Sequence, residues 1–284
     1  MSAALEVWTT HMELDSTFLK RTEPLNPEDE PRTLIFVDML GFAAFTEKHP
    51  TRTAESGPDE HGFSGSGTTE LQLRVNTFQR ILDQFFFEWG LYGGLPGMIF
   101  SDCAYLDGGN PLRSALIAVS LMQAFLTNDI PVRIGIGKGT YYPFKFSTEV
   151  QGSVVLARAL FAGTAVVRAH AAEHGGGKGM RIFVSPSLEI DIPAIQQRVQ
   201  VLPLSKPTKG AAWELDYSIQ HADTRWPKKI DDWDNRVYAF VDELDDPVES
   251  PEVRIHYSET RDALDRMRAA NGKTKFQRPS DRRL

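Results

Sequence analysis

The sequence predicts an α+β sandwich of ferredoxin-like type, and three observations lead to this expectation. Short apolar runs bounded by turn residues alternate with longer segments in which apolar residues recur at helical spacing. In chain order these segments read β-α-β-β-α-β-α-β-β. The β-α-β-β-α-β portion is the core unit of a ferredoxin-like fold, and the remaining segments add a helix and strands to it.

The predicted strands are apolar runs that stop at a turn or at a charged residue. The first, residues 33–42, ends in an aspartate, a turn and a glycine. A hairpin over residues 98–106 carries Asp102 near its tip. The strand at 132–139 has glycine at every second position, so another segment can approach its backbone closely. Two further strands are expected at residues 181–185 and 213–216.

Three helices are expected between these strands. Residues 70–89 place apolar side chains at helical spacing, and residues 112–126 are strongly apolar. The third pattern, residues 160–173, is followed by the three glycines at 175–177, which are typical of a helix end.

The chain divides into three predicted parts. Residues 1–31 are polar, contain several prolines and form a predicted N-terminal leader. Residues 32–218 form the predicted domain, in which the Gly/Ser/Thr-rich segment 50–69 is expected to be a mobile loop. Residues 219–284 form a predicted C-terminal extension with an amphipathic helix near 258–270.

The composition is that of a soluble globular protein, with 41% hydrophobic and 24% charged residues among 284 and a net charge of −7. An acidic balance argues against non-specific nucleic-acid binding, but a few local cations can still hold a small anionic ligand. The single cysteine, Cys103, cannot form an internal disulfide, and the N-terminal residues lack the features of a signal peptide. We therefore expect a cytoplasmic protein that binds neither nucleic acid nor membrane.

Two aspartates stand in similar apolar contexts, Asp38 in FVDMLGF and Asp102 in FSDCAYL. A carboxylate beside a buried strand is costly unless it is paired, hydrogen-bonded or bound to a cation. Because the strands that carry them would be neighbours, the two carboxylates can converge on one site that suits Mg²⁺ or Mn²⁺. The alternative is that Asp38 caps a turn and Asp102 sits in a hairpin bend.

Five segments together give a more specific indication. In chain order they are FVDMLGFAAFTE, FSDCAYLDGG, VRIGIGKG, GTAVVRAHAAE and LSKPTKGAAWEL. Their order and content resemble the class III nucleotidyl cyclases, the fold of adenylate and guanylate cyclases, over about residues 32–217. Asp102 follows Asp38 by 64 residues, a longer separation than in typical members, and the segment 50–69 accounts for the surplus.

The resemblance implies a metal-binding role for the first two segments. Asp38, Asp102 and the backbone carbonyl of Met39 would bind two Mg²⁺ or Mn²⁺ ions per site, and Phe42 belongs to the Gly-Phe turn beside the substrate. The expected chemistry is attack of a ribose 3′-OH on the α-phosphate, which closes the cyclic monophosphate and releases pyrophosphate.

The last of the five segments resembles the late Lys-Gly loop that meets the substrate triphosphate. Lys209, which Gly210 follows, fits that motif better than Lys206, and the alternative for either is a solvated surface lysine. The family builds each site from two chains. The resemblance therefore implies a homodimer with sites at its interface, in which one chain's lysine acts on the nucleoside triphosphate bound by the other.

The sequence departs from the family at the positions that select the base and stabilise the transition state. Met98 and Leu160 align with the lysine and aspartate that recognise adenine, and neither side chain can hydrogen-bond a purine. Val167 and Ala171 align with the usual asparagine and arginine of the helix. Arg168 lies on the same helical face as Ala171 and is a candidate to replace that arginine; a surface ion pair is the alternative.

A class III-like chain without the purine-selecting residues resembles the pyrimidine cyclases of bacterial anti-phage (Pycsar) defence, which are stand-alone cyclases. That resemblance implies conversion of UTP, or of CTP, into a cyclic monophosphate that switches on a downstream effector. Three alternatives stay open: an inactive nucleotide-binding or dimerisation module, a divergent purine cyclase, and another palm-type nucleotidyltransferase.

The other polar residues near these segments are expected to be structural. Arg133 and Lys138 are interpreted as strand-edge residues that favour solubility. His170 and His174 are expected to be exposed residues of a helix, and without a Cys/His cluster the sequence does not indicate zinc.

Overall fold

The computed structural model describes residues 19–21, 31–48, 70–90, 97–150, 153–219, 233–245 and 251–273. The predicted loop at 50–69 lies outside the described residues, and so does most of the predicted leader at 1–31.

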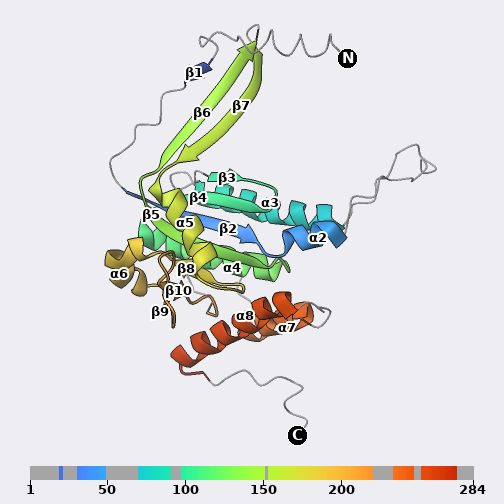
Figure 1. Ribbon diagram of the computed structural model, residues 1–284, viewed down its shortest axis with the longest axis vertical. Coiled ribbons are helices and arrows are strands. Elements are labelled where there is room, and N and C mark those ends of the chain that lie inside the picture. The colour runs from blue at the N-terminus through green and yellow to red at the C-terminus, as the bar shows by residue number, and fades with distance from the viewer. Residues whose placement is uncertain are drawn as a thin grey trace, which may run out of the picture.

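A seven-stranded sheet forms the centre of the molecule, with the strand order β3-β4-β2-β5-β8-β10-β9 (Figure 1). Its strands are β2 (Arg32–Met39), β3 (Gly97–Ile99), β4 (Cys103–Gly109), β5 (Val132–Gly139), β8 (Ile182–Val184), β9 (Val201–Pro203) and β10 (Trp213–Leu215). Neighbouring strands are antiparallel except β5 and β8, which are parallel.

The helices complete the predicted alternation of elements. They are α2 (Phe42–Lys48), α3 (Glu70–Gly90), α4 (Pro111–Thr127), α5 (Thr164–Gly175), α6 (Ile192–Gln196), α7 (Trp233–Asp245) and α8 (Pro251–Ala270), with a 3₁₀ helix η2 (Pro186–Asp191) before α6. The unit β2-α3-β3-β4-α4-β5 is a ferredoxin-like β-α-β-β-α-β core, with β2 and β4 side by side. The predicted α+β class and its core are confirmed.

The two faces of the sheet are covered by different helices. Alternate residues of β2 enter the main core, which contains α3 and α4: Ile35, Val37 and Met39. Leu34 and Phe36 instead pack against Ala165 and Ala169 of α5. Side chains alternate along a strand, so Asp38, two residues after Phe36, belongs to the face that α5 covers.

Two glycines allow α5 to lie directly on β5. A Cβ at Gly135 would stand 2.1 Å from the carbonyl oxygen of Ala169, and one at Gly137 would stand 2.4 Å from the Ala169 nitrogen. No side chain fits between such surfaces. The close approach predicted from the glycine pattern is thus confirmed, and the segment that makes it is α5.

A long hairpin of β6 (Tyr142–Val150) and β7 (Ser153–Ala162) projects from the sheet, and β1 (Leu19–Arg21) pairs with β6 (Figure 1). The sequence interpretation missed both hairpin strands. The helix predicted at 160–173 begins only at Thr164, because Leu160 pairs with Phe144 on β6 and Gly163 adopts a φ of +132°, which a helix cannot contain.

The C-terminal helices pack on the same core as the sheet. Val237 of α7 and Leu264 and Met267 of α8 are buried members of the main hydrophobic cluster. The amphipathic helix predicted near 258–270 is confirmed within the longer α8, whereas the domain division at residue 218 stays a prediction. Among the described helices, none combines the length and the apolar character needed to cross a bilayer.

Candidate functional site

The structure places Asp102 beside the end of the strand that carries Asp38. Asp38, near the end of β2, stands opposite Cys103 of β4 on one side and Arg133 of β5 on the other. Asp102 lies in the bend between β3 and β4, and its backbone carbonyl accepts a 2.8 Å hydrogen bond from the nitrogen of Met39. Both aspartates are half-buried. The hairpin predicted around Asp102 is confirmed, and it sets that residue beside the end of β2.

The carboxylate of Asp38 lies in an environment that disfavours its charge. The pKa of Asp38 is raised to about 7. Burial is the largest cause, and the negative charges of Glu173 and Asp102 also raise it. The positive charge of Arg133 opposes this rise. Within the described residues, the Asp38 side chain makes no hydrogen bond or ion pair. A proton or a bound cation would therefore stabilise this carboxylate.

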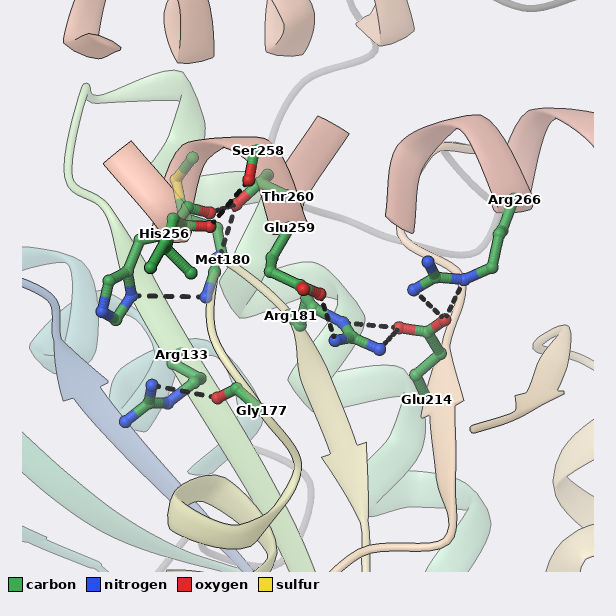
Figure 2. A network of polar contacts seen from close by, with 12 residues as sticks. Arg133, Gly177, Met180, Arg181, Glu214, His256, Ser258, Glu259, Thr260 and Arg266 are labelled. Atoms are coloured by element: carbon green, nitrogen blue, oxygen red, sulfur yellow. Dashed lines mark hydrogen bonds and ion pairs between the residues drawn. The ribbon is translucent and has the colours of Figure 1, made fainter. Parts of the chain in front are cut away.

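A buried ion pair lies beside Asp38. Glu173 of α5 is fully buried, and its Oε1 accepts a hydrogen bond from Nε of Arg133 and forms an ion pair with Nη2 of the same residue. Arg133 also donates from Nη1 to the carbonyl oxygen of Gly177 at 3.2 Å (Figure 2). The other oxygen of Glu173, Oε2, lies 2.6 Å from Nδ1 of His174.

The structure corrects the expectation that Arg133 and Lys138 are strand-edge residues that favour solubility. Arg133 is not a strand-edge residue that favours solubility: β5 is an internal strand, and Arg133 is only 8% exposed because Glu173 and Gly177 enclose it. Lys138 is half-buried and forms an ion pair with Asp191 at 2.8 Å. His170 and His174 are exposed as expected, and their rings stack 4.6 Å apart.

The donors at this site fit a small, hard divalent cation. Asp38 and Asp102 offer carboxylate oxygens, and Met39, the last residue of β2, offers the backbone carbonyl that the resemblance assigns to the metal. Oxygen donors of this kind suit Mg²⁺ and Mn²⁺, which keep open positions for water and phosphate. Within the described ranges no three His, Cys, Asp or Glu side chains are grouped to hold a metal.

Met98 and Leu160, the two residues expected at the base pocket, lie on β3 and β7. An aromatic contact connects β7 with β4, the neighbour of β3. Met98 of β3 is half-buried and stands opposite Tyr105 of β4. The Tyr105 ring lies 4.7 Å from the ring of Phe161, which follows Leu160 on β7, and 4.5 Å from that of Phe36. Sequence reasoning missed this aromatic cluster because residues 160–162, the end of β7, were expected to belong to a helix.

The other residues predicted to bind substrate lie on separate elements, α2 and the loop between β9 and β10. Phe42, the first residue of α2, is half-buried and packs against the main core. Lys206 and Lys209 are exposed on the loop between β9 and β10. Thr208 Oγ1 in that loop donates to the carbonyl oxygen of Gly175 at 3.0 Å, so the loop lies at the same end of α5 as Glu173.

Arg168 lies toward the opposite end of α5. Its Nη1 donates to the backbone carbonyl of Lys138 at 2.7 Å. Lys138 is five residues along β5 from Arg133, which corresponds to about 17 Å of extended strand. The guanidinium of Arg168 is therefore not gathered with Asp38 in a single chain. Val167, beside it, is 67% exposed.

Several solved structures resemble this chain, among them two adenylyl cyclases and one guanylyl cyclase. The adenylyl cyclase CyaB from P. aeruginosa has 17% identity and a TM-score of 0.43, covering 68% of this chain and 96% of that one. The guanylyl cyclase Cya2 has 17% identity and a TM-score of 0.41, covering 65% and 91%. An adenylate cyclase from Trypanosoma brucei has 15% identity and a TM-score of 0.47, covering 68% and 92%.

No family model matches the sequence. No curated protein matches it either.

Proposed function

We propose that this protein is a metal-dependent nucleotidyl cyclase that acts on a pyrimidine nucleotide. The observation that carries the proposal is the pair of Asp38, on β2, and Asp102, in the bend that leads into the adjacent strand β4, with no ion pair to Asp38 among the described residues. The five family-like segments support it, because they contribute the strands and the helix around this pair.

The division of labour follows from these positions. Asp38, Asp102 and the carbonyl of Met39 would hold two Mg²⁺ or Mn²⁺ ions, which when bound lower the pKa of a ribose 3′-OH and neutralise the triphosphate. The two aspartates, fixed by neighbouring strands, orient the substrate for attack of the 3′-oxygen on the α-phosphate. A new O–P bond closes the ring, the bond to the β-phosphate oxygen breaks, and pyrophosphate leaves.

We propose that the working form is a homodimer with sites at its interface. Arg168 and Val167 are exposed on α5, and Lys206 and Lys209 are exposed on the loop beside its other end. Since Arg168 lies far from Asp38 along β5, it can reach a metal-bound nucleotide only from the second chain. Lys209 would then neutralise the partner's triphosphate, with Lys206 as the alternative.

Base choice is assigned to Met98 and Leu160. An apolar pair leaves the polar edge of a purine without partners, and each unpaired group in a closed pocket costs about 1–3 kcal/mol. A pyrimidine is smaller and has fewer groups to satisfy, and the ring of Tyr105 near Phe161 offers it an aromatic surface. We favour UTP over CTP, and the product would be a cytoplasmic second messenger that switches on an effector in anti-phage defence.

The second candidate function is a nucleotide-binding or dimerisation module without turnover. The observation that favours it is the outer face of α5, where Ala171 takes the place of the family's arginine while Arg168 is already bonded to the Lys138 carbonyl. A divergent purine cyclase is the third possibility, and it requires a base pocket other than Met98 and Leu160.

One assay separates these functions. Purified protein is incubated with Mn²⁺ and each of the four nucleoside triphosphates, products are identified by mass, and kcat/KM is compared. We expect cyclic UMP or cyclic CMP, with at least about a tenfold preference over both purines, which equals roughly 1.4 kcal/mol. A clear preference for ATP or GTP would overturn the pyrimidine assignment, and binding of nucleotide without any cyclic product would favour the module.

A further inference from the structure

Asp38 and Arg133 are direct cross-strand neighbours that do not bond to each other. They are register partners in the antiparallel pair of β2 and β5, so their side chains leave the same face of the sheet. Opposite charges in such positions are about 5 Å apart at Cβ and normally attract each other. In this structure the guanidinium of Arg133 instead binds Glu173 and the carbonyl of Gly177.

The position of Glu173 is fixed by the contact between α5 and β5. A Cβ at Gly135 would stand 2.5 Å from the backbone nitrogen of Glu173 and 2.8 Å from its Cβ. Gly135 lies two residues from Arg133 on the same face of β5, so the carboxylate of Glu173 is placed within reach of that arginine. Ala169 and Ala165, one and two turns earlier than Glu173, face the same strand and are fully buried.

Burial stabilises the ion pair of Arg133 and Glu173 against separation. Glu173 is 0% exposed and Arg133 is 8% exposed, and a buried charge that loses its partner is strongly destabilising. Glu173 has a further contact at Oε2 with His174, and Arg133 has one with Gly177. The carboxylates of Asp38 and Glu173 both lie beside the guanidinium of Arg133, and the ion pair forms with Glu173.

We propose that Glu173 is a positioning residue that holds Arg133 away from Asp38 and so leaves the Asp38 carboxylate free for a divalent cation. The inference rests on the proposed metal site at Asp38 and Asp102, and it extends that site to a residue of α5 that makes no contact with the metal itself.

The test is Mn²⁺ binding to the nucleotide-free full chain, followed by electron paramagnetic resonance and by titration calorimetry. With Glu173→Gln, Arg133 loses its anionic partner and turns to Asp38, so we expect Mn²⁺ affinity to fall at least about tenfold. In Glu173→Gln/Arg133→Met the competing cation is gone as well, and affinity should return to within about threefold of the original chain. Recovery on removal of a second residue distinguishes positioning from structural support.

Glu214→Gln is the matched control. Glu214 is also a fully buried glutamate bonded to arginine, but its partners are Arg181 and Arg266, on the side of the sheet near α8 (Figure 2). We expect it to weaken folding and to leave Mn²⁺ affinity unchanged. If Glu173→Gln is unfolded by circular dichroism, Glu173→Asp replaces it, since the shorter carboxylate loosens its hold on Arg133 while the charge stays.

Each outcome decides the inference. Unchanged Mn²⁺ affinity in the folded Glu173 variant overturns it while the metal site stands. A double variant that binds as weakly as the single one also overturns it. Absence of Mn²⁺ binding in the original chain overturns the metal site proposed at Asp38 and the inference with it.

Discussion

Two buried carboxylates of this molecule have contrasting environments. Glu214 of β10 is fully buried, and two arginines bind it: Arg181 donates to Oε2 at 2.7 Å, and Arg266 donates to Oε1 at 2.9 Å (Figure 2). Asp38 of β2 is half-buried, and among the described residues no cation is bonded to it, although Arg133 stands directly opposite.

The contrast indicates a structural role for Glu214 and a functional role for Asp38. A buried carboxylate with two bound guanidinium groups is compensated within the fold, and it fastens α8 to the sheet. A carboxylate whose cationic neighbour is bound elsewhere costs free energy in the metal-free chain. Proteins keep such costs mainly where a ligand or substrate later compensates them. Asp38 is therefore the stronger candidate for chemistry.

The largest expected effect is on turnover at the uncompensated site. Asp38→Ala or Asp102→Ala removes a metal ligand, and we expect kcat to fall roughly a thousandfold or more while the chain remains folded. The measurement is cyclic nucleotide formation with Mn²⁺, beside circular dichroism and the oligomeric state. Activity retained in either folded variant would place the metals elsewhere.

The second effect concerns the compensated carboxylate. Glu214→Gln leaves Arg181 buried without its anionic partner, and we expect the free energy of unfolding to fall by about 3 kcal/mol, as for other broken buried pairs. Urea unfolding followed by tryptophan fluorescence measures this loss. Cyclase kcat of the folded fraction should not change; a loss of kcat with unchanged stability would reverse the contrast between the two sites.

The smallest effect is a gain of stability at Asp38. Its pKa in the folded chain is about 7, above the ordinary 3.8, so the folded state holds the proton more tightly than the unfolded state does. Stability is therefore lost as pH rises from about 4 to 7, and Asp38→Asn removes that loss. We expect the variant to be more stable than the original chain by about 1 kcal/mol at pH 8 with chelator, and by less at pH 5. An equal or lower stability at pH 8 would mean that Asp38 is already compensated.

The sequence predicted the core and the pair of aspartates because both depend on local patterns. Apolar runs with period two and helices with apolar periodicity gave the β-α-β-β-α-β order, and strand order followed from that topology. The hairpin turn placed Asp102 beside the end of β2. None of these inferences required knowledge of a contact between distant helices and strands.

The strands β6 and β7 and the role of Glu173 could not be predicted in the same way. The run around Leu160 fits either a strand or a helix, and pairing with Phe144 and the turn at Gly163 decide between them. The burial of Glu173 depends on α5 lying on Gly135. One signal was available: Ala165, Ala169 and Glu173 recur every four residues, which indicates that Glu173 faces the sheet with the two alanines.

The order of Asp38, Arg133 and Glu173 along the chain determines when the metal site can form during synthesis. Arg133 follows Asp38 by 95 residues, and Glu173 follows Arg133 by another 40. At about 5–20 residues per second, a ribosome takes roughly 2–8 s to add those 40 residues. During that interval the carboxylates of Asp38 and Asp102 are already made, whereas that of Glu173 is not. Docking of α5 then brings Glu173 to the arginine, so the open metal site can form only after about three fifths of the chain has been synthesised.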